Sequence, residues 1–292
     1  MLSKEAMHRE QLANKVMRAP LRTPKEASLR YHDYGPQPVS VASINKWKMQ
    51  LDKTDRKLAW KLLQEIIYFS EVETKNILVR QNKTLMNNLI KAGLSTKKLI
   101  YLQTDDAGSS SPVMLGMLRD AARLQQRGCK LVDGRDGLRI NNVTKTLEEG
   151  AIIYVDDFVG SGDQLIEARS VIMSSVVGHF AEFLLVPSIC EEGYKRLTDL
   201  GIAVYSGHIH AKAERPLLEN SHILDDKERE RLITLCKEIR PNTSLGYGNL
   251  ATMVVLYRNA PDSLPAVLRG SDKQKPFYGL FPRVKDLPVL ET

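Results

Sequence analysis

A series of short apolar segments that alternate with helix-like segments, beginning near Lys97, constrains the fold of this 292-residue chain most strongly. Four of the apolar segments have the length of buried strands, and they lie at 99–103, 151–155, 180–187 and 202–207. The segments between them have helical periodicity, over 112–125, 164–176 and 191–200. Strands and helices at this spacing predict an α/β fold with a mostly parallel sheet flanked by helices. A further strand is expected at 251–258.

The first hundred residues have a different pattern. Residues 1–40 contain four prolines and many basic side chains, which predicts a basic arm with one short helix. From Ile44 to about Ala92 apolar residues recur at helical spacing, including the segment 57–70, and Gly93 is a helix stop signal. The chain is therefore expected to have three parts, which are an arm (1–40), a helical subdomain (41–95) and a domain that contains the sheet (96–292).

Composition excludes several classes of protein. With 42% hydrophobic and 26% charged residues, the chain has the composition of an ordinary soluble domain. No apolar run is long enough to cross a bilayer, and the N-terminus lacks the apolar core of a signal peptide. Three widely spaced cysteines, Cys129, Cys190 and Cys236, predict neither disulfides nor a zinc site. We expect a cytoplasmic protein with no membrane partner.

The net charge of +7 is concentrated near the N-terminus, where residues 1–50 hold nine basic and four acidic side chains. A basic arm attracts nucleic acid because binding releases counterions from the phosphate backbone. A solvated tail would have the same composition. The sequence contains no RNA-recognition signature that would favour nucleic acid. Charge alone does not decide between a nucleic-acid contact and a solvated tail, so both interpretations of the arm stay open.

Two strand ends carry polar chemistry that is suited to a ligand. Asp156 and Asp157 follow the strand 151–155, and the sequence TDDAGSSSP follows the strand 99–103. Because open parallel sheets bind ligands at the carboxyl ends of their strands, the two loops are expected on one edge of the sheet. In the second of these sequences, Ser111 before Pro112 predicts the N-cap and the first residue of a helix.

The turn GSGDQ has two interpretations. Gly160 and Gly162 allow successive amides to converge on an anion, and the following helix adds the positive end of its dipole, which predicts a phosphate cradle. The alternative is a tight turn in which Asp163 caps the helix. Asp156 and Asp157 favour the cradle, because carboxylates at the end of a buried strand need partners such as sugar hydroxyls or hydrated Mg²⁺. A phosphoribosyl diphosphate satisfies both requirements.

The segment IIYVDDFVGSGDQ resembles the signature of type I phosphoribosyltransferases. That signature is an apolar strand, two acids, three residues, Thr or Ser, Gly, one residue, and Thr or Ser. The match extends through Gly162, and Gln164 stands where the family has its last hydroxyl residue. The resemblance implies the type I phosphoribosyltransferase fold with an N-terminal helical extension. It also implies phosphoribosyl diphosphate or a related nucleotide as the ligand, with Mg²⁺ as the cofactor.

The resemblance assigns roles to individual residues. Asp156 and Asp157 would be catalytic residues that hold the ribose and, together with the diphosphate, Mg²⁺. The residues implied for phosphate binding are Gly160, Ser161, Gly162, Asp163 and Gln164. The residues implied for the diphosphate loop are Asp105, Asp106, Gly108, Ser109 and Ser110. Solvated loop acids are the alternative for the first two of that loop.

The segment GCKLVDGRDGLRINNVTK lies between the two loops in the sequence and is rich in basic residues. An enzyme of this kind is expected to have a mobile, basic catalytic loop there. Arg135, flanked by Gly134 and Gly137, is the candidate catalytic residue that would reach the diphosphate. A solvated surface is the alternative for the basic side chains of this segment.

The C-terminal third carries a second resemblance. The segments LGYGNLATMVVLYRNAPDSLPAVLRG and KPFYGLFPRV are similar to phosphoribosyltransferase-like proteins of bacterial conflict and antiphage systems, some of which are encoded with retron reverse transcriptases. This resemblance covers roughly residues 55–285. It implies an effector that modifies or depletes nucleotides in the infected host. Phe277 and Tyr278 would stack on a base, and core packing is the alternative for both.

The sequence leaves three functions open. An enzyme would break the bond from ribose C1 to diphosphate, or a related N-glycosidic bond. A catalytically silent sensor would bind a phosphoribosyl nucleotide and act through partners, and Gln164 and the helical addition favour it. An assembly subunit would use the basic N-terminal region to associate with a reverse transcriptase–DNA complex or with other defence-system subunits.

Overall fold

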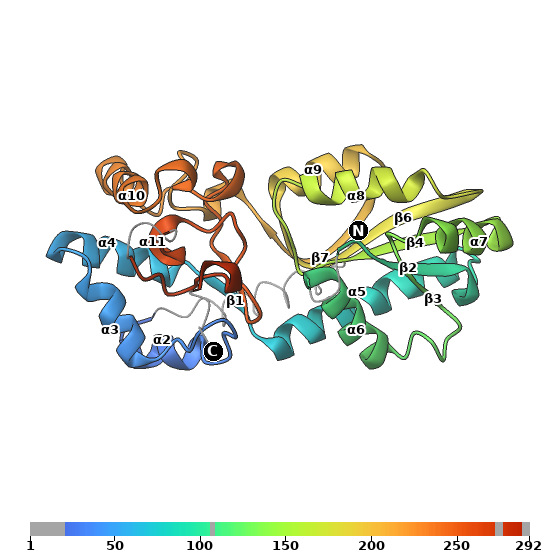
Figure 1. Ribbon diagram of the computed structural model, residues 1–292, viewed down its shortest axis with the longest axis horizontal. Coiled ribbons are helices and arrows are strands. Elements are labelled where there is room, and N and C mark those ends of the chain that lie inside the picture. The colour runs from blue at the N-terminus through green and yellow to red at the C-terminus, as the bar shows by residue number, and fades with distance from the viewer. Residues whose placement is uncertain (1–20, 106–108, 272–276, 288–292) are drawn as a thin grey trace. The chain divides into compact units, whose positions relative to one another are not determined.

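The computed structural model describes residues 21–105, 109–271 and 277–287. Within this part of the chain the structure forms two compact units (Figure 1). The first unit combines the chain up to Glu71 with the chain from Ala211 onward, and the second unit spans Val72–His210. Each unit has its own hydrophobic core.

The second unit is built on a parallel sheet. Its strands are β2 (Leu99–Gln103), β3 (Lys130–Asp133), β4 (Glu149–Val155), β5 (Phe158–Val159), β6 (His179–Cys190) and β7 (Ala203–His210). Strands β3, β2, β4 and β6 are neighbours in that order, while β5 and β7 also pair with β6. All of these pairings are parallel. The prediction of a mostly parallel α/β fold is confirmed.

Helices cover both faces of this sheet. They are α5 (Glu71–Lys91), α6 (Ser110–Ala122), α7 (Gly137–Leu147), α8 (Asp163–Met173) and α9 (Glu191–Asp199), with a 3₁₀ turn η1 (Thr96–Lys98). Figure 1 shows α8 and α9 on one face and α5 and α6 on the other. The side chains of β2 alternate between the two faces of the sheet. Ile100 and Leu102 belong to the core under α8 and α9. The intervening Tyr101 donates its hydroxyl to Asn82 of α5 at 2.6 Å.

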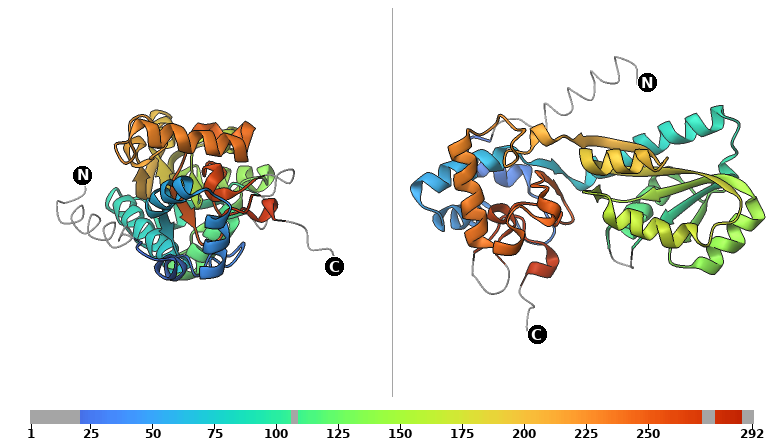
Figure 2. Two further views of the ribbon diagram at one scale, coloured as in Figure 1. Left: turned by 90° about the vertical axis from the view of Figure 1, so that its left-hand side faces the viewer. Right: turned by 90° about the horizontal axis from the view of Figure 1, so that it is seen from above.

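The first unit joins the two ends of the described chain. Its elements are α2 (Pro24–Arg30), α3 (Val41–Met49), α4 (Lys53–Gln64), β1 (Ile67–Phe69), α10 (Asp226–Ile239), β8 (Val254–Leu256) and α11 (Ala266–Arg269). Its 3₁₀ turns are η2 (Lys212–Glu214), η3 (Pro241–Thr243), η4 (Tyr247–Asn249) and η5 (Val284–Asp286). The buried indole of Trp47 donates to the carbonyl of Val267 at 2.8 Å. The N-terminal helices therefore share a core with the C-terminal third (Figure 2), and the expected N-terminal helical extension is present.

The end of α4 differs from the prediction. Periodicity alone extends a helix through residue 70, but α4 ends at Gln64 and Ile67–Phe69 form β1, so that prediction is wrong. β1 pairs in parallel with β8. Apolar spacing in a short run is consistent with helix or strand, and here the pairing with β8 decides between them. The strand expected at 251–258 is β8, and it lies in the first unit rather than in the sheet of the second.

The segment 128–145, for which a loop was expected, is largely regular. It contains β3 and most of α7, so the expectation of a loop over the whole segment is wrong. Asp136 begins α7 by accepting the amide of Arg139 at 2.9 Å. Ile140 is buried, and Val143 packs against the same core. Lys130 lies at an exposed position of the edge strand β3, and Arg139 and Lys145 lie at exposed positions of α7. Arg135 lies in the turn between these two elements.

The two compact units divide the chain at points other than the boundaries expected from the sequence. The segment 41–95 contributes α3 and α4 to the first unit and nearly all of α5 to the second. The described part of the expected arm contains the short helix α2 and the fully buried Tyr31. This part of the arm therefore belongs to the core of the first unit.

Two expectations from composition concern membranes and disulfides. None of the helices in the described ranges is long and apolar enough to cross a membrane. All three cysteines are described and buried, and no disulfide joins any two of them.

Candidate functional site

The loops that follow β2 and β4 meet at the carboxyl edge of the sheet. Ser111 is fully buried near the start of α6, and its hydroxyl donates to the carbonyl of Val155, the last residue of β4, at 2.7 Å. The same oxygen accepts the amide of Thr104, directly after β2, at 2.9 Å. One side chain therefore ties the two loops together, on the shared edge that the parallel sheet predicts.

This contact replaces the predicted role of Ser111. Ser109 occupies the N-cap position of α6 and Ser110 is its first residue, so the prediction of Ser111 as N-cap is wrong. Pro112 is tolerated inside the first turn because the amides there have no partner within the helix. The Ser111 hydroxyl instead satisfies a buried carbonyl at the end of a strand, where an unpaired group would be costly.

Carboxylates from both loops gather beside Ser110. Its hydroxyl donates to Asp156 at 2.8 Å and lies 3.4 Å from a carboxylate oxygen of Asp105. The same Asp156 oxygen that binds Ser110 accepts the amide of Asp157 at 2.8 Å. We call Asp105, Asp156 and Asp157 the acidic edge. Two residues implied for the diphosphate loop, Asp106 and Gly108, lie outside the described residues.

The acidic edge disfavours its own ionisation. Burial raises the pKa of Asp156 well above its usual value, and the negative charges of Asp157 and Asp105 raise it further. The hydrogen bonds from Ser110 and from the Asp157 amide oppose this effect without cancelling it. A carboxyl group in this state gains when a cation or a hydroxyl donor arrives, because either one stabilises its charged form.

The glycine-rich turn GSGDQ leads from β5 into α8. Gly162 occupies the N-cap position with a φ of 87°, in the left-handed region that favours glycine, and no side chain caps the helix. The alternative in which Asp163 caps α8 is therefore wrong. The first-turn amides of α8 are arranged as in an anion-binding helix N-terminus. The Ser161 hydroxyl donates to Asp163 at 2.5 Å.

Arg196 of α9 contacts this turn, and nothing in the sequence indicated that contact. Its Nη1 donates to the Ser161 carbonyl at 2.9 Å and to the Asp163 carboxylate at 2.5 Å. The carboxylate would otherwise oppose an anion at the turn, and Arg196 balances its charge. The two side chains are 47% and 44% exposed, so an incoming anion can reach the guanidinium. Arg196 differs from other surface arginines in its contact with Asp163, which lies 33 positions earlier in the sequence. A contact over this separation has no local sequence signal.

Helix α9 supports the turn through a close glycine contact. A Cβ atom at Gly193 would lie 2.4 Å from the Gly160 carbonyl oxygen and 3.1 Å from a Val159 methyl carbon. The shorter of these distances does not occur without displacement of the backbone. Gly193 therefore allows α9 to approach the turn closely and to hold its conformation.

A second network fixes α8 against the sheet. Arg169 of α8 donates to both carboxylate oxygens of Glu182 on β6, at 2.7 and 2.6 Å. The buried Tyr154 of β4 donates its hydroxyl to the same carboxylate at 2.7 Å. Because α8 begins at the glycine-rich turn, this network also sets the direction in which the turn's amides point.

The candidate catalytic residue Arg135 follows β3 at the same edge of the sheet. The amide of the preceding Gly134 donates to the carbonyl of Gln103, the last residue of β2, at 2.9 Å. The guanidinium of Arg135 donates to Asp133 at 3.0 and 2.7 Å. This contact lowers the pKa of Asp133 to about 2. In this structure Arg135 is thus held by Asp133, and its role toward a diphosphate stays a prediction.

Phe277 and Tyr278, the expected base-stacking residues, lie in the first unit. Phe277 is partly buried and packs against the core of that unit. Tyr278 is 55% exposed, and the ammonium of Lys46 lies 3.7 Å from its ring centroid. Packing therefore accounts for Phe277, whereas Tyr278 keeps an exposed ring.

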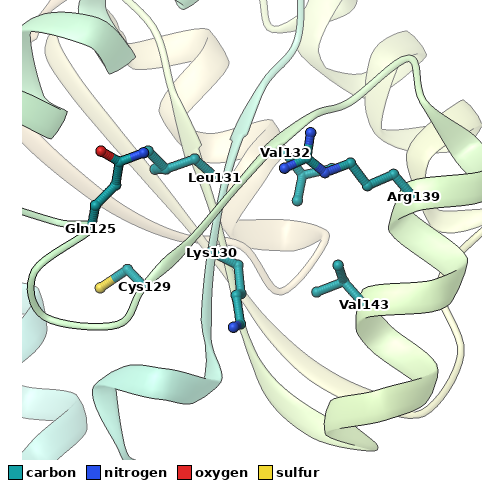
Figure 3. A pocket seen from close by; sticks show the side chains of 7 residues that line it. All are labelled: Gln125, Cys129, Lys130, Leu131, Val132, Arg139 and Val143. Carbon is teal, nitrogen blue, oxygen red and sulfur yellow. The ribbon is translucent and has the colours of Figure 1, made fainter.

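A separate cavity of about 210 Å³ opens beside β3 and α7 (Figure 3). It is lined by Gln125, Cys129, Lys130, Leu131, Val132, Arg139 and Val143. None of these residues belongs to the acidic edge or to the glycine-rich turn. Burial raises the pKa of the Cys129 thiol, so this cysteine is not activated as a nucleophile.

One protein family and several solved structures are similar to this chain. The model of the PRTase-CE family matches residues 44–283, which include both loops and parts of both units. No curated protein matches the sequence. Among solved structures, the orotate phosphoribosyltransferase from Aeropyrum pernix is 17% identical with a TM-score of 0.29, and the match covers 43% of this chain and 67% of that chain. The AQ2163 protein from Aquifex aeolicus is 9% identical with a TM-score of 0.30, over 58% of this chain and 83% of that chain.

Proposed function

The chain belongs to the PRTase-CE family of phosphoribosyltransferase-like proteins, and from this premise we propose that it binds phosphoribosyl diphosphate or a related nucleotide. The proposed site is the carboxyl edge of the sheet in the second unit. The observation that carries this proposal is the hydrogen bond from Ser110 to Asp156, which joins the loop after β2 to the paired acids after β4. A ligand over both loops would meet carboxylates and an uncapped helix N-terminus together.

In this proposal each part of the ligand has its own partners. The amides at the start of α8 donate to the 5-phosphate, and the Ser161 hydroxyl turns from Asp163 toward it. Asp156 and Asp157 accept hydrogen bonds from the ribose hydroxyls. The pair thereby orients C1 for displacement of its substituent without forming a covalent bond to it.

The residues at the acidic edge fit a Mg²⁺ ion. Carboxylate oxygens are ligands that Mg²⁺ prefers, and the carboxylates of Asp105 and Asp156 lie beside Ser110. The negative charge of Asp157 also acts on Asp156. The raised pKa of Asp156 is consistent with a carboxyl group that a cation restores to its charged form. When bound with the diphosphate, Mg²⁺ stabilises the negative charge that develops on this leaving group. Arg135, once released from Asp133, would add a second positive charge there.

The double substitution Asp156→Asn with Asp157→Asn tests the site. Titration calorimetry with phosphoribosyl diphosphate and MgCl₂ should show an affinity at least about tenfold lower, because two charge-assisted hydrogen bonds are weakened. The matched control is Asp120→Asn with Asp199→Asn, which removes two exposed acids from α6 and α9. An unchanged affinity in a folded Asp156→Asn, Asp157→Asn protein contradicts the proposed site.

Turnover separates an enzyme from a sensor. Release of diphosphate from the bound ligand, lost in the double variant, supports a phosphoribosyltransferase or nucleotide N-glycosidase. Saturable binding without release supports the sensor, which is the second candidate function. The specific feature that favours the sensor is Gln164, an exposed residue at the position where the family signature has a hydroxyl.

We also propose that the protein is an effector of a bacterial antiphage system of the retron type. The similarity of the two C-terminal segments to such proteins supports this role. Cells that express the protein should arrest growth or reduce phage yield, and the Asp156→Asn, Asp157→Asn variant should do neither. Full protection by that variant contradicts an effector activity at the acidic edge.

The basic N-terminal region is the proposed contact for a reverse transcriptase–DNA complex or another defence-system subunit. Because Leu21 and Tyr31 belong to the core of the first unit, the test removes residues 1–20 alone. This truncation removes Lys4, Arg9, Lys15 and Arg18. It should weaken association with DNA and reduce the dependence of that association on salt. Unchanged association and salt dependence contradict this role.

A further inference from the structure

Four basic side chains converge on two acids in the first unit, around the turn η5 and the end of α11. They are Arg240, Arg269, Arg283 and Lys285, which we call the basic cluster. Arg269 donates to both carboxylate oxygens of Asp286, at 2.7 and 3.2 Å. Arg240 approaches the same carboxylate at 3.7 Å. Both arginines are nearly fully buried, with 5% and 7% of their surfaces exposed.

The outer part of the basic cluster is less completely satisfied. Arg283 forms an ion pair with Asp262, whose carboxylate lies 3.4 Å from its Nη1. The Nε of Arg283 is buried and donates a hydrogen bond to no described group. Arg269 uses its Nη1 on the main-chain carbonyl of Asp262, at 3.0 Å. A buried guanidinium nitrogen without an acceptor is costly, and an added acceptor would remove this cost.

Positive charge gathers on the open side of the basic cluster. Among the described residues, Arg269 and Arg283 form ion pairs with Asp286 and Asp262, and Lys285 adds a further positive charge beside them. The positive charge of Arg283 lowers the pKa of Lys285, and burial and Arg269 lower it further. Lys285 is exposed and the Arg283 side chain is 23% exposed, so solvent reaches the cluster from this side.

We propose that the basic cluster is a second anion site, which binds the phosphoryl group of a small ligand. A phosphate monoester carries up to two negative charges and several acceptor oxygens, which suit the unpaired Nε–H of Arg283 and the ammonium of Lys285. Lys285 and Arg283 form the open side, and Arg269 and Arg240 lie deeper. The site is made only of first-unit residues and is independent of the site proposed for the second unit.

Side-chain NMR of the arginine Nε–H groups tests this proposal on the full chain. Inorganic phosphate is titrated at constant ionic strength, and the Arg283 signal is the one that disappears in the Arg283→Gln variant. We expect a saturable shift of the Arg283 and Arg269 signals with phosphate. Chloride at equal ionic strength should not reproduce it. Absence of the shift, or an equal shift with chloride, overturns the proposal and leaves a purely structural ion cluster.

Matched variants assign the response to the basic cluster. Lys285→Gln should weaken phosphate binding about threefold, as expected for the loss of one exposed charge. Lys227→Gln, at an exposed position of α10 in the same unit, should have no effect. Equal weakening by both variants overturns the proposal, because only a general charge effect would then remain. The response should persist in Gly193→Ala, which disturbs the glycine-rich turn, and its loss there also overturns the proposal.

A final titration distinguishes the sources of the phosphoryl group. Adenosine 5′-monophosphate is compared with inorganic phosphate on the same Arg283 signal. Tighter binding of the nucleotide identifies a nucleotide phosphate as the ligand, and equal affinity identifies free phosphate. Both results support an anion site, and the absence of a response to either ligand refutes it.

Discussion

The acidic edge is rich in negative charge and the basic cluster in positive charge, and folding shifts the pKa values of their carboxyl groups in opposite directions. At the acidic edge, burial, Asp157 and Asp105 together raise the pKa of Asp156. In the basic cluster, burial opposes ionisation of Asp286, yet Arg269 and Arg240 outweigh it and lower the pKa. Folding thus stabilises the charge of one acid and penalises the charge of the other.

This difference separates structural charges from charges that are suited to a ligand. Asp286 has partners within the protein, so its ion pairs with Arg269 and Arg240 contribute to the stability of the first unit. Asp156 is held at a cost to the folded protein, which is typical of functional sites. Loss of a charge should therefore have effects of opposite sign in the two regions.

The largest expected effect is in the basic cluster. Arg269→Met should lower the free energy of unfolding by about 3 kcal/mol, because it leaves Asp286 buried without its bidentate partner. Urea unfolding measures this loss. Because the pKa of Asp286 is lowered in the folded state, its contribution is present above its unfolded pKa and disappears as the pH falls through the folded value. The difference between wild type and variant should shrink in acid.

The control for this prediction is an exposed pair. Arg119→Met removes the partner of Asp120, and these side chains are 44% and 70% exposed. The urea midpoint should not change. An equal effect of the two substitutions would show that burial does not distinguish the ion pairs.

The second effect concerns the glycine-rich turn. Gly193→Ala places a Cβ 2.4 Å from the Gly160 carbonyl, and the resulting displacement should cost about 2 kcal/mol of stability. Affinity for phosphoribosyl diphosphate should fall about tenfold if the turn holds the 5-phosphate. Gly116→Ala in α6 is the control, since outside its chain neighbours and the adjacent backbone of α6 no atom lies within 4 Å of the added carbon. Normal affinity in a destabilised Gly193→Ala protein would show that the turn is not the phosphate site.

The third effect has the opposite sign. Asp156→Asn should raise the free energy of unfolding at neutral pH by about 1 kcal/mol, because it removes an unfavourable buried charge and keeps an acceptor for Ser110. A raised folded-state pKa means that stability falls as the pH rises from the unfolded pKa through the folded value. The gain over wild type should therefore vanish in acid, below the unfolded pKa. Thermal unfolding over a pH series measures it.

Asp133→Asn is the matched comparison within the same unit. The hydrogen bond from Arg135 lowers the pKa of Asp133 to about 2, so this substitution should destabilise the protein at neutral pH. If both substitutions change stability in the same direction, the acidic edge does not carry the proposed strain.

The smallest effect on stability is expected at Arg196. Its pair with Asp163 is about half exposed, so Arg196→Gln should change the free energy of unfolding by less than about 1 kcal/mol. Affinity for the phosphorylated ligand should nevertheless fall about fivefold, because Asp163 would then face the phosphate without a balancing charge. Lys195→Gln, on the same helix, is the control. Equal affinities of the two variants would remove Arg196 from the site.

Features that depend on a dozen neighbouring residues were predictable from the sequence. The strand 99–103 is β2 with the same bounds, and Gly93 ends the helical segment as expected. Asp156 and the glycine-rich turn were identified because apolar strand, acids and glycines follow one another directly. The meeting of the two loops followed from the parallel order of the strands. All of these signals are local or are simple consequences of sheet geometry.

Contacts between distant segments decided the rest. Ile67–Phe69 form a strand because β8 lies beside them. Ser109 rather than Ser111 occupies the N-cap position of α6, and the Ser111 hydroxyl binds the carbonyl of Val155. Arg196 belongs to the glycine-rich turn, and Arg269 belongs to the basic cluster, only after helices have packed. Hydrogen bonds and ion pairs of this kind depend on how the chain returns on itself, and no short stretch of sequence encodes that geometry.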